Sequence, residues 1–222
     1  MKENLTELVF ILDRSGSMSG LEEDTIGGFN SLIEKQKAEE GEALVSTVLF
    51  DGLQEVLYDR VPLQQVEQMT RKQYYVRGTT ALLDAVGGAI HHIGNVHKYA
   101  REEDRPAKTL FIITTDGMEN ASHNYSYDQV KKMITRQQEK YHWEFLFLGA
   151  NIDAAATADR FGIRRGNAVN FENDSEGIKL NYRVLSETVA TYRRAEPAAA
   201  RVSGDWADEI REDYTKRHDK KK

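Results

Sequence analysis

The chain has 222 residues, 40% hydrophobic and 30% charged, which is the balance of a globular protein able to bury a core. Its formal charge is −6; the last twelve residues, 211–222, carry a net +3, so the remainder carries −9, which argues against a nucleic-acid-binding body. The absence of cysteine excludes disulfides and thiolate metal sites. No signal peptide and no apolar run near the ~20 residues that span a bilayer are recognised, so we expect a cytoplasmic protein without a membrane partner.

Short apolar runs predict the strands of a sheet. Three of them are nearly continuously apolar and end at small or polar turns, which is typical of parallel strands covered on both faces. Two further runs flank Asp51-Gly52-Leu53, a hairpin turn that makes one edge pair antiparallel. In chain order, strands are expected over Leu8–Leu12, Ala43–Phe50, Gln54–Val61, Leu110–Thr115, Phe145–Leu148 and, more briefly, Ala168–Phe171.

Helical spacing of apolar residues fills the gaps between these strands. Helices are expected over Gly20–Lys37, Ala81–Tyr99, Tyr127–Lys140 and Glu176–Arg194. The alternation predicts an α/β fold, a doubly wound, mostly parallel six-stranded sheet with one antiparallel edge strand and helices on both faces. Pro197 and the alanines after it suggest that the domain covers residues 1–195. Residues 196–222 would then form a charged C-terminal extension, partly helical or disordered.

Polar residues at the ends of the predicted strands suggest a metal site. In an open α/β sheet, ligands bind beyond the carboxyl ends of the strands. Asp13, Ser15 and Ser17 follow the first strand, Thr79 and Thr80 open a helix, and Asp116 follows the fourth strand. Two carboxylates and several hydroxyls suit a hard cation such as Mg²⁺, whereas zinc or copper would need cysteine or paired histidines.

The motifs DRSGSMSG, RGTTAL and ITTDGMEN resemble, in order and spacing, the metal-site motifs of the von Willebrand factor A family. The resemblance covers roughly residues 5–195, and FLFLGANIDAAATADRFGI adds a weaker likeness to small stand-alone bacterial and phage members. It implies a mostly parallel sheet with one antiparallel edge strand. It also implies a metal-ion-dependent adhesion site built from Asp13, Ser15, Ser17, Thr80 and Asp116, with Thr80 preferred to Thr79 by the family spacing G-x-T-x-L.

The resemblance further implies a function without catalysis. A divalent cation, Mg²⁺ with Mn²⁺ or Ca²⁺ as alternatives, would keep an open position for an Asp or Glu of a partner protein. We therefore interpret the chain as a metal-dependent protein-binding module. Two other interpretations stay open: a metal-dependent phosphatase or hydrolase, and a structural or assembly protein whose site is unoccupied.

The sequence lacks the motifs that would support a metal-dependent phosphatase or hydrolase. No phosphate-binding loop of the form G-x-x-x-x-G-K-[ST] and no G-x-S-x-G elbow occurs. A haloacid-dehalogenase-like phosphotransferase also has an Asp ending its first strand, but that family needs a second Asp where this chain has Ser15.

Several other residues have two interpretations. Asp84 could support the metal loops, but an ordinary first-turn carboxylate is favoured. His91, His92 and His97 lack metal-ligand spacing, which favours surface or packing roles. Asn151 and Asp153 could lie at the rim of the site, with a helix cap favoured for Asp153. Met18 and Met118 could line a partner surface or anchor the loops by packing.

Overall fold

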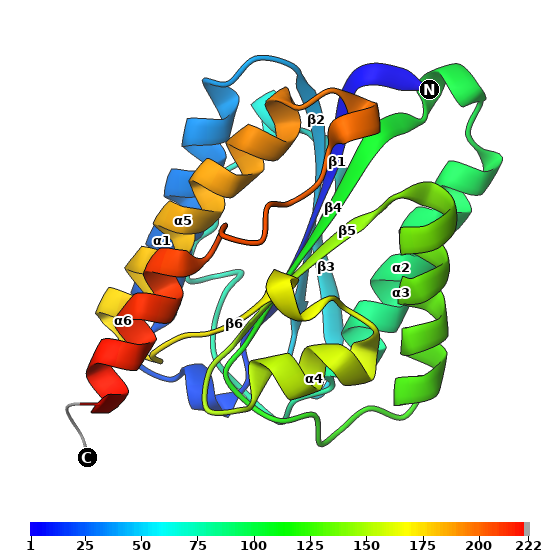
Figure 1. Ribbon diagram of the computed structural model, residues 1–222. Coiled ribbons are helices and arrows are strands. Elements are labelled where there is room, and N and C mark those ends of the chain that lie inside the picture. Colours follow the sequence, from blue (N-terminus) through cyan, green and yellow to red (C-terminus); the bar gives the residue numbers. More distant parts are fainter. Residues whose placement is uncertain (220–222) are drawn as a thin grey trace.

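A computed structural model describes residues 1–219 as a six-stranded sheet between two layers of helices (Figure 1). The strand order is β3-β2-β1-β4-β5-β6, and every neighbouring pair is parallel except β2 with β3. The strands are β1 Lys2–Asp13, β2 Glu42–Phe50, β3 Gln54–Pro62, β4 Pro106–Thr115, β5 Glu144–Gly149 and β6 Ala168–Asn170. The predicted fold class, including the antiparallel edge strand, is confirmed.

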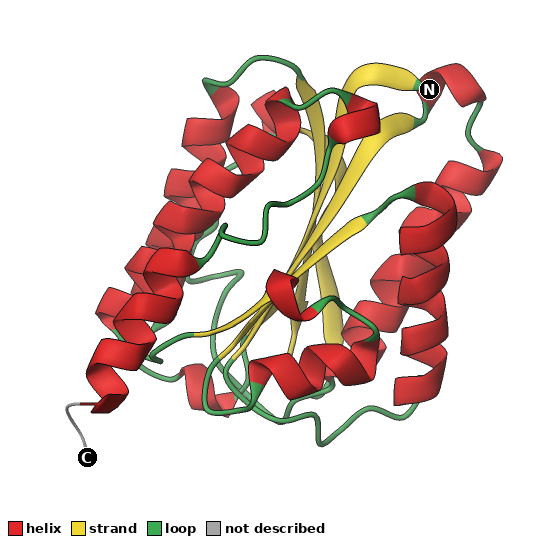
Figure 2. Ribbon diagram, viewed as in Figure 1, coloured by secondary structure: helices red, strands yellow, loops and turns green. Residues whose placement is uncertain are grey.

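Helices cover both faces of this sheet (Figure 2). One layer contains α1, α5 and α6, and the other contains α2, α3 and α4. Their bounds are α1 Glu22–Lys37, α2 Leu82–Tyr99, α3 Tyr127–Tyr141, α4 Ala154–Phe161, α5 Ser175–Arg194 and α6 Asp208–Asp219. Within residues 1–219, no helix is long and apolar enough to cross a membrane.

The continuous apolar run of β1 is explained by these two layers. Alternate side chains of a strand point to opposite faces of the sheet. Leu8, Phe10 and Leu12 belong to the core under α1 and α5, whereas Val9 and Ile11 belong to the core under α2 and α3. Since both faces are buried, no polar alternation is needed.

Local signals fix where the helices begin and end. Ser126 and Gln129 form a reciprocal capping box at the start of α3. Asp174 caps α5 by accepting a hydrogen bond from the Gly177 backbone N–H. Gly162 adopts a left-handed conformation, with φ of 77°, and ends α4. The four predicted long helices are therefore found within two residues of their expected bounds.

Two regions differ from the sequence-based expectation. The first strand starts at Lys2 rather than Leu8, because the polar residue Glu7 is buried and paired with Arg60 and His97. Residues after 195, expected to form a charged extension that is partly helical or disordered, include the helix α6 and contribute side chains to the core under α1 and α5. The buried side chains of this segment are Ala200, Val202, Ala207 and Ile210.

Candidate metal centre

The two aspartates of the predicted site lie at the carboxyl ends of the two central strands. Asp13 is the last residue of β1, and Asp116 directly follows β4. These strands are parallel neighbours, with Leu12 opposite Thr114. Residues 99 positions apart, Ser17 and Asp116, thereby come within hydrogen-bonding distance.

Hydrogen bonds link the first loop to the second aspartate. The Ser15 backbone N–H donates to Asp13 Oδ1 at 2.7 Å. The Ser15 and Ser17 hydroxyl oxygens are 3.1 Å apart, and Ser17 Oγ donates to Asp116 Oδ1 at 2.5 Å. Four of the five predicted metal residues thus form one connected group.

Thr80 completes the group from the loop before α2. A methyl placed on Gly117 would lie 3.5 Å from both Ser17 Oγ and Thr80 Oγ1, so the two hydroxyls flank the space beside Gly117. Thr79 faces elsewhere, because its Oγ1 lies against Gly52. The structure therefore brings together all five predicted residues, with Thr80 rather than Thr79 among them. Their coordination of a metal remains a prediction.

When no cation is bound, burial favours the protonated form of both carboxylates. Burial raises the pKa of Asp13 from its ordinary value of 3.8 to about 6, an effect that hydrogen bonds from Ser15 and Thr115 oppose and the charge of Asp116 increases. Burial also raises the pKa of Asp116, against hydrogen bonds from Ser17 and Asn173. Among the described residues neither carboxylate has an ion-pair partner. A bound divalent cation would supply the missing positive charge.

The donor set fits a hard cation. Residues 1–219 contain no group of three or more His, Cys, Asp or Glu side chains placed to hold a metal ion. A cation at this site would therefore depend on hydroxyl oxygens and water beside the two carboxylates. Mg²⁺ accepts such a site, since it needs only one or two protein carboxylates and retains waters.

Three residues that sequence analysis did not select hold the aspartates in place. Thr115 Oγ1 donates to Asp13 Oδ2 at 2.6 Å, and the buried Tyr74 hydroxyl donates to the Asp13 carbonyl oxygen. Asn173 Nδ2 donates to Asp116 Oδ2 at 2.9 Å. Thr115 lies inside a recognised motif, but Tyr74 and Asn173 come from distant loops that carry no motif.

Asp84 supports the loop that follows Asp116. Its carboxylate accepts hydrogen bonds from the backbone N–H groups of His123, Asn124 and Tyr125. Burial would raise the pKa of Asp84, but these hydrogen bonds outweigh it and lower the pKa. In the same loop Glu119 accepts from the Leu83 backbone N–H at the start of α2. Asp84 is thus a loop anchor rather than an ordinary first-turn carboxylate.

The three histidines of α2 have separate environments. His92 Nε2 lies 2.7 Å from Asp59 Oδ1, and His97 Nε2 lies 3.1 Å from Glu7 Oε2. His91 lies near the Tyr125 hydroxyl. The surface or packing roles expected for these residues agree with the contacts.

The remaining sequence candidates divide between the rim and the interior. Asn151, in a left-handed conformation, donates to the Asp116 carbonyl oxygen, so it lies at the rim. Asp153 caps α4 as expected, accepting from the Ala156 backbone N–H. Met18 packs in the core, whereas Met118 is 73% exposed beside Asp116. Only Met118 is available to a partner.

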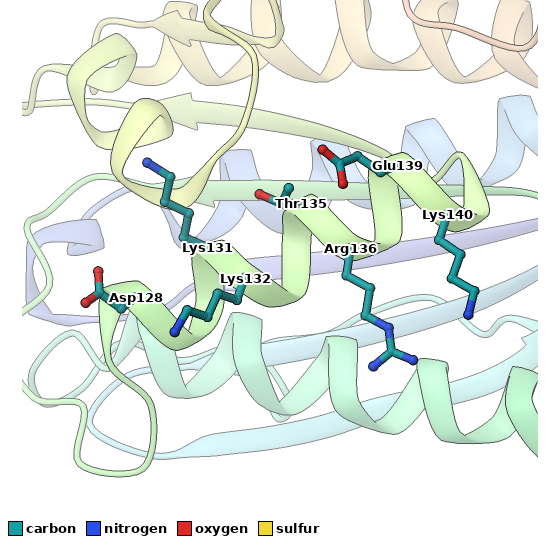
Figure 3. A pocket seen from close by; sticks show the side chains of 7 residues that line it. All are labelled: Asp128, Lys131, Lys132, Thr135, Arg136, Glu139 and Lys140. Atoms are coloured by element: carbon teal, nitrogen blue, oxygen red, sulfur yellow. The ribbon is translucent and has the colours of Figure 1, made fainter.

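Two hollows among the described residues, 1–219, do not form a second converged site. A cavity of about 20 Å³ lies behind Asp13 and is lined by Thr25, Asn181 and Tyr182, among others, and it has room for one water molecule. A shallow depression on α3 is lined by residues of that helix alone, and their charged ends spread apart (Figure 3).

Comparisons with known proteins identify the fold. No protein-family model matches the sequence, and no curated protein matches it either. The structure of proximal thread matrix protein 1 from the mussel byssus, with a zinc-occupied MIDAS motif, is 10% identical with a TM-score of 0.57, covering 85% of this chain and 46% of that one. Manganese-loaded TRAP protein from Plasmodium vivax is 18% identical, with a TM-score of 0.54, and the match covers 80% of this chain and 73% of that one.

A von Willebrand factor type A protein from Catenulispora acidiphila is 14% identical, with a TM-score of 0.53, and the match covers 85% of this chain and 43% of that one. This chain thus spans less than half the length of two of these three proteins. At such identities the similarity establishes the fold. The chain has the fold of a von Willebrand factor A-type domain.

Proposed function

We propose that the protein is a metal-dependent protein-binding module. Asp13, Ser15, Ser17, Thr80 and Asp116 hold a divalent cation, Mg²⁺ in the first instance, some directly and some through water. The cation supplies a Lewis-acidic open position for an Asp or Glu side chain of a partner protein. The observation that carries the proposal is the meeting of two buried, unpaired carboxylates with three hydroxyls at one edge of the sheet.

The chemistry of the site supports binding rather than catalysis. The three hydroxyl ligands are neutral, so beyond the two carboxylates no further negative charge weakens the attraction between the cation and an incoming carboxylate. Position 15 holds a serine, so the acid/base aspartate that a haloacid-dehalogenase-like phosphotransferase needs is missing. Two structural neighbours, one with zinc in its MIDAS motif and one loaded with manganese, support a divalent cation in this fold.

Calorimetric titration of the chelator-treated protein tests the metal. Mg²⁺, Mn²⁺ and Ca²⁺ are titrated separately into the wild type, Asp13→Ala and Asp59→Asn. The last variant is the control, because Asp59 is an exposed carboxylate on β3 that pairs with His92 of α2. We expect binding in the wild type and control but none in Asp13→Ala. Equal binding in all three proteins would contradict the proposed ligands.

A pull-down from the native cell tests the partner. We expect a protein retained by the wild type in Mg²⁺ and released by chelator or by Asp13→Ala. A phosphatase assay on a generic aryl phosphate tests the opposing enzyme hypothesis. Metal-dependent turnover that disappears in Asp13→Asn would overturn the binding function.

A further inference from the structure

Arg14 lies between two proposed metal residues, yet its side chain points into the protein. It is the largest side chain that is fully buried, with 0% exposure. A buried guanidinium is stable only when its charge is paired. Its Nε donates to Asp51 Oδ2 at 2.9 Å, and Nη1 pairs with Glu55 at 2.8 Å.

Asp51 is shared between two arginines. Arg77 Nε donates to the same Oδ2 at 2.8 Å, while Oδ1 accepts from the Leu53 backbone N–H. The guanidinium carbons of Arg14 and Arg77 lie 5.1 and 5.2 Å from the centroid of the Tyr75 ring. One carboxylate therefore holds two cationic side chains against one aromatic ring.

The two arginines belong to the two loops that carry the hydroxyl ligands. Arg14 precedes Ser15, and Arg77 opens the segment that ends at Thr80. Backbone hydrogen bonds join the same segments: Arg77 N–H donates to the Arg14 carbonyl oxygen at 3.0 Å, and Gly16 N–H donates to the Gly78 carbonyl oxygen at 3.2 Å. The backbone carbonyl oxygen of Asp51 accepts from the Ala81 backbone N–H at 2.7 Å.

We propose that Asp51, Arg14 and Arg77 form a positioning cluster that sets the separation between the Ser15–Ser17 loop and Thr80, and thereby the affinity of the site for its cation. This inference rests on the proposed metal-binding function. None of the three residues is a ligand; each acts through the backbone it anchors. The β2–β3 hairpin, which contributes no ligand, becomes part of the metal site through Asp51.

Electrostatics and positioning predict opposite results for Arg77. If Arg77 acted only through its charge, its removal would strengthen cation binding, because like charges repel. If it positions the threonine loop, its removal weakens binding. Loss of supporting contacts around metal ligands typically lowers metal affinity by about 10- to 100-fold.

The test compares Mg²⁺ affinity in Arg77→Met, Arg77→Lys and Arg60→Met. Arg60 is a matched control, since it also pairs a partly exposed guanidinium with a buried carboxylate, Glu7 on β1. We expect Arg77→Met to bind Mg²⁺ about ten-fold more weakly. Arg77→Lys should recover part of this loss, because lysine can still donate to Asp51. Arg60→Met should lose stability in urea but keep the wild-type dissociation constant.

A double variant, Arg14→Met with Asp51→Asn, removes one charge of each sign and leaves no unpaired buried guanidinium. We expect the same weakening of affinity in a protein that still folds. Unchanged or tighter binding in Arg77→Met and the double variant would overturn the positioning role, as would equal weakening in Arg60→Met. A wild type that binds no metal would instead remove the proposed function itself.

Discussion

At the scale of single residues, Gly117 borders the space where we propose that the cation binds. It lies between Ser17 Oγ and Thr80 Oγ1, and a methyl at this position would be in ordinary contact with both hydroxyls. Gly117 is outside the left-handed region, so an alanine there fits the backbone. The absence of a side chain is therefore needed for the space rather than for the conformation.

We expect Gly117→Ala to fold with a free energy of unfolding within about 1 kcal/mol of the wild type. Its methyl occupies space that the cation and its waters need, so calorimetry should detect no Mg²⁺ binding. Gly166→Ala is the control, because nothing lies within 4 Å of the methyl it would carry. Metal binding by Gly117→Ala would place the cation elsewhere.

The raised pKa of Asp13, about 6, predicts two opposite pH dependences. In chelated protein, the folded state holds this proton more tightly than the unfolded state, so the contribution of Asp13 to stability is largest below pH 4. It is lost as pH rises from about 4 to 6.

With Mg²⁺ present, the cation needs the ionised carboxylate, so the affinity of the protein for Mg²⁺ falls by up to about ten-fold per pH unit below pH 6. Urea denaturation between pH 4 and 8, with and without Mg²⁺, measures both effects. Asp13→Asn should reduce the slope of the chelated protein, and Asp116, whose pKa burial also raises, accounts for the part that remains. A slope unchanged in Asp13→Asn would assign the proton to another group.

At the scale of elements, the loop between β4 and α3 is held against the start of α2. Asp84 accepts three backbone N–H groups of this loop, and Asn120 Oδ1 accepts from the Thr80 backbone N–H. We expect Asp84→Ala to lower the free energy of unfolding by about 3 kcal/mol, because it leaves these donors without an acceptor. Chemical denaturation measures the loss. Asp128→Ala is the control, since that carboxylate lies on the outer surface of α3 (Figure 3). A change under 1 kcal/mol in Asp84→Ala would show that water replaces the carboxylate.

The C-terminal segment tests where the domain ends. The sequence predicts that the domain ends at 195, and Ile210 of α6, which lies beyond that position, is buried in the core under α1 and α5. Ile210→Ala should cost about 2–4 kcal/mol of stability, and a chain ending at 195 should lose more. Lys216→Ala, on the exposed face of α6, should have no measurable effect. A truncated chain as stable as the full one would restore the boundary at 195.

Much of the fold could be predicted, because strands buried on both faces are recognisable as apolar runs. The start of β1 could not, since Glu7 is compatible with a buried strand only through Arg60 and His97, which are distant in sequence. The three sequence motifs contain all five of the candidate metal residues that the structure brings together. Tyr74 and Asn173 reach the site through tertiary packing, which leaves no local pattern. Nothing in the motif DRSGSMSG indicates a partner for Arg14, and its pairing with Asp51 becomes visible only once the loops are placed.

At the scale of the whole molecule, the strand order explains why the site is where it is. The chain runs from β1 outward through β2 to β3, and then returns to the other side of β1 as β4. In open α/β sheets, ligands bind beyond the carboxyl ends of the strands at such a reversal, which here lies between β1 and β4. Asp13 and Asp116 end or directly follow these two strands, so the reversal alone brings the carboxylates together.

The pairing of β1 with β4 also has a kinetic consequence. Pairing Leu12 with Thr114 closes a long loop and costs conformational entropy, so we expect the proposed cation site to be complete only late in folding. A ligand that binds only after the barrier slows unfolding and leaves the folding rate unchanged. At 100 times the dissociation constant, Mg²⁺ should stabilise the protein by about 2.7 kcal/mol, and unfolding should be about 100-fold slower. Stopped-flow dilution into and out of urea measures both rates; acceleration of refolding by Mg²⁺ would mean that the site forms before the barrier. If the refolding rate is unchanged, bound Mg²⁺ lengthens the lifetime of the folded chain by slowing its unfolding, and it does not help the chain to fold.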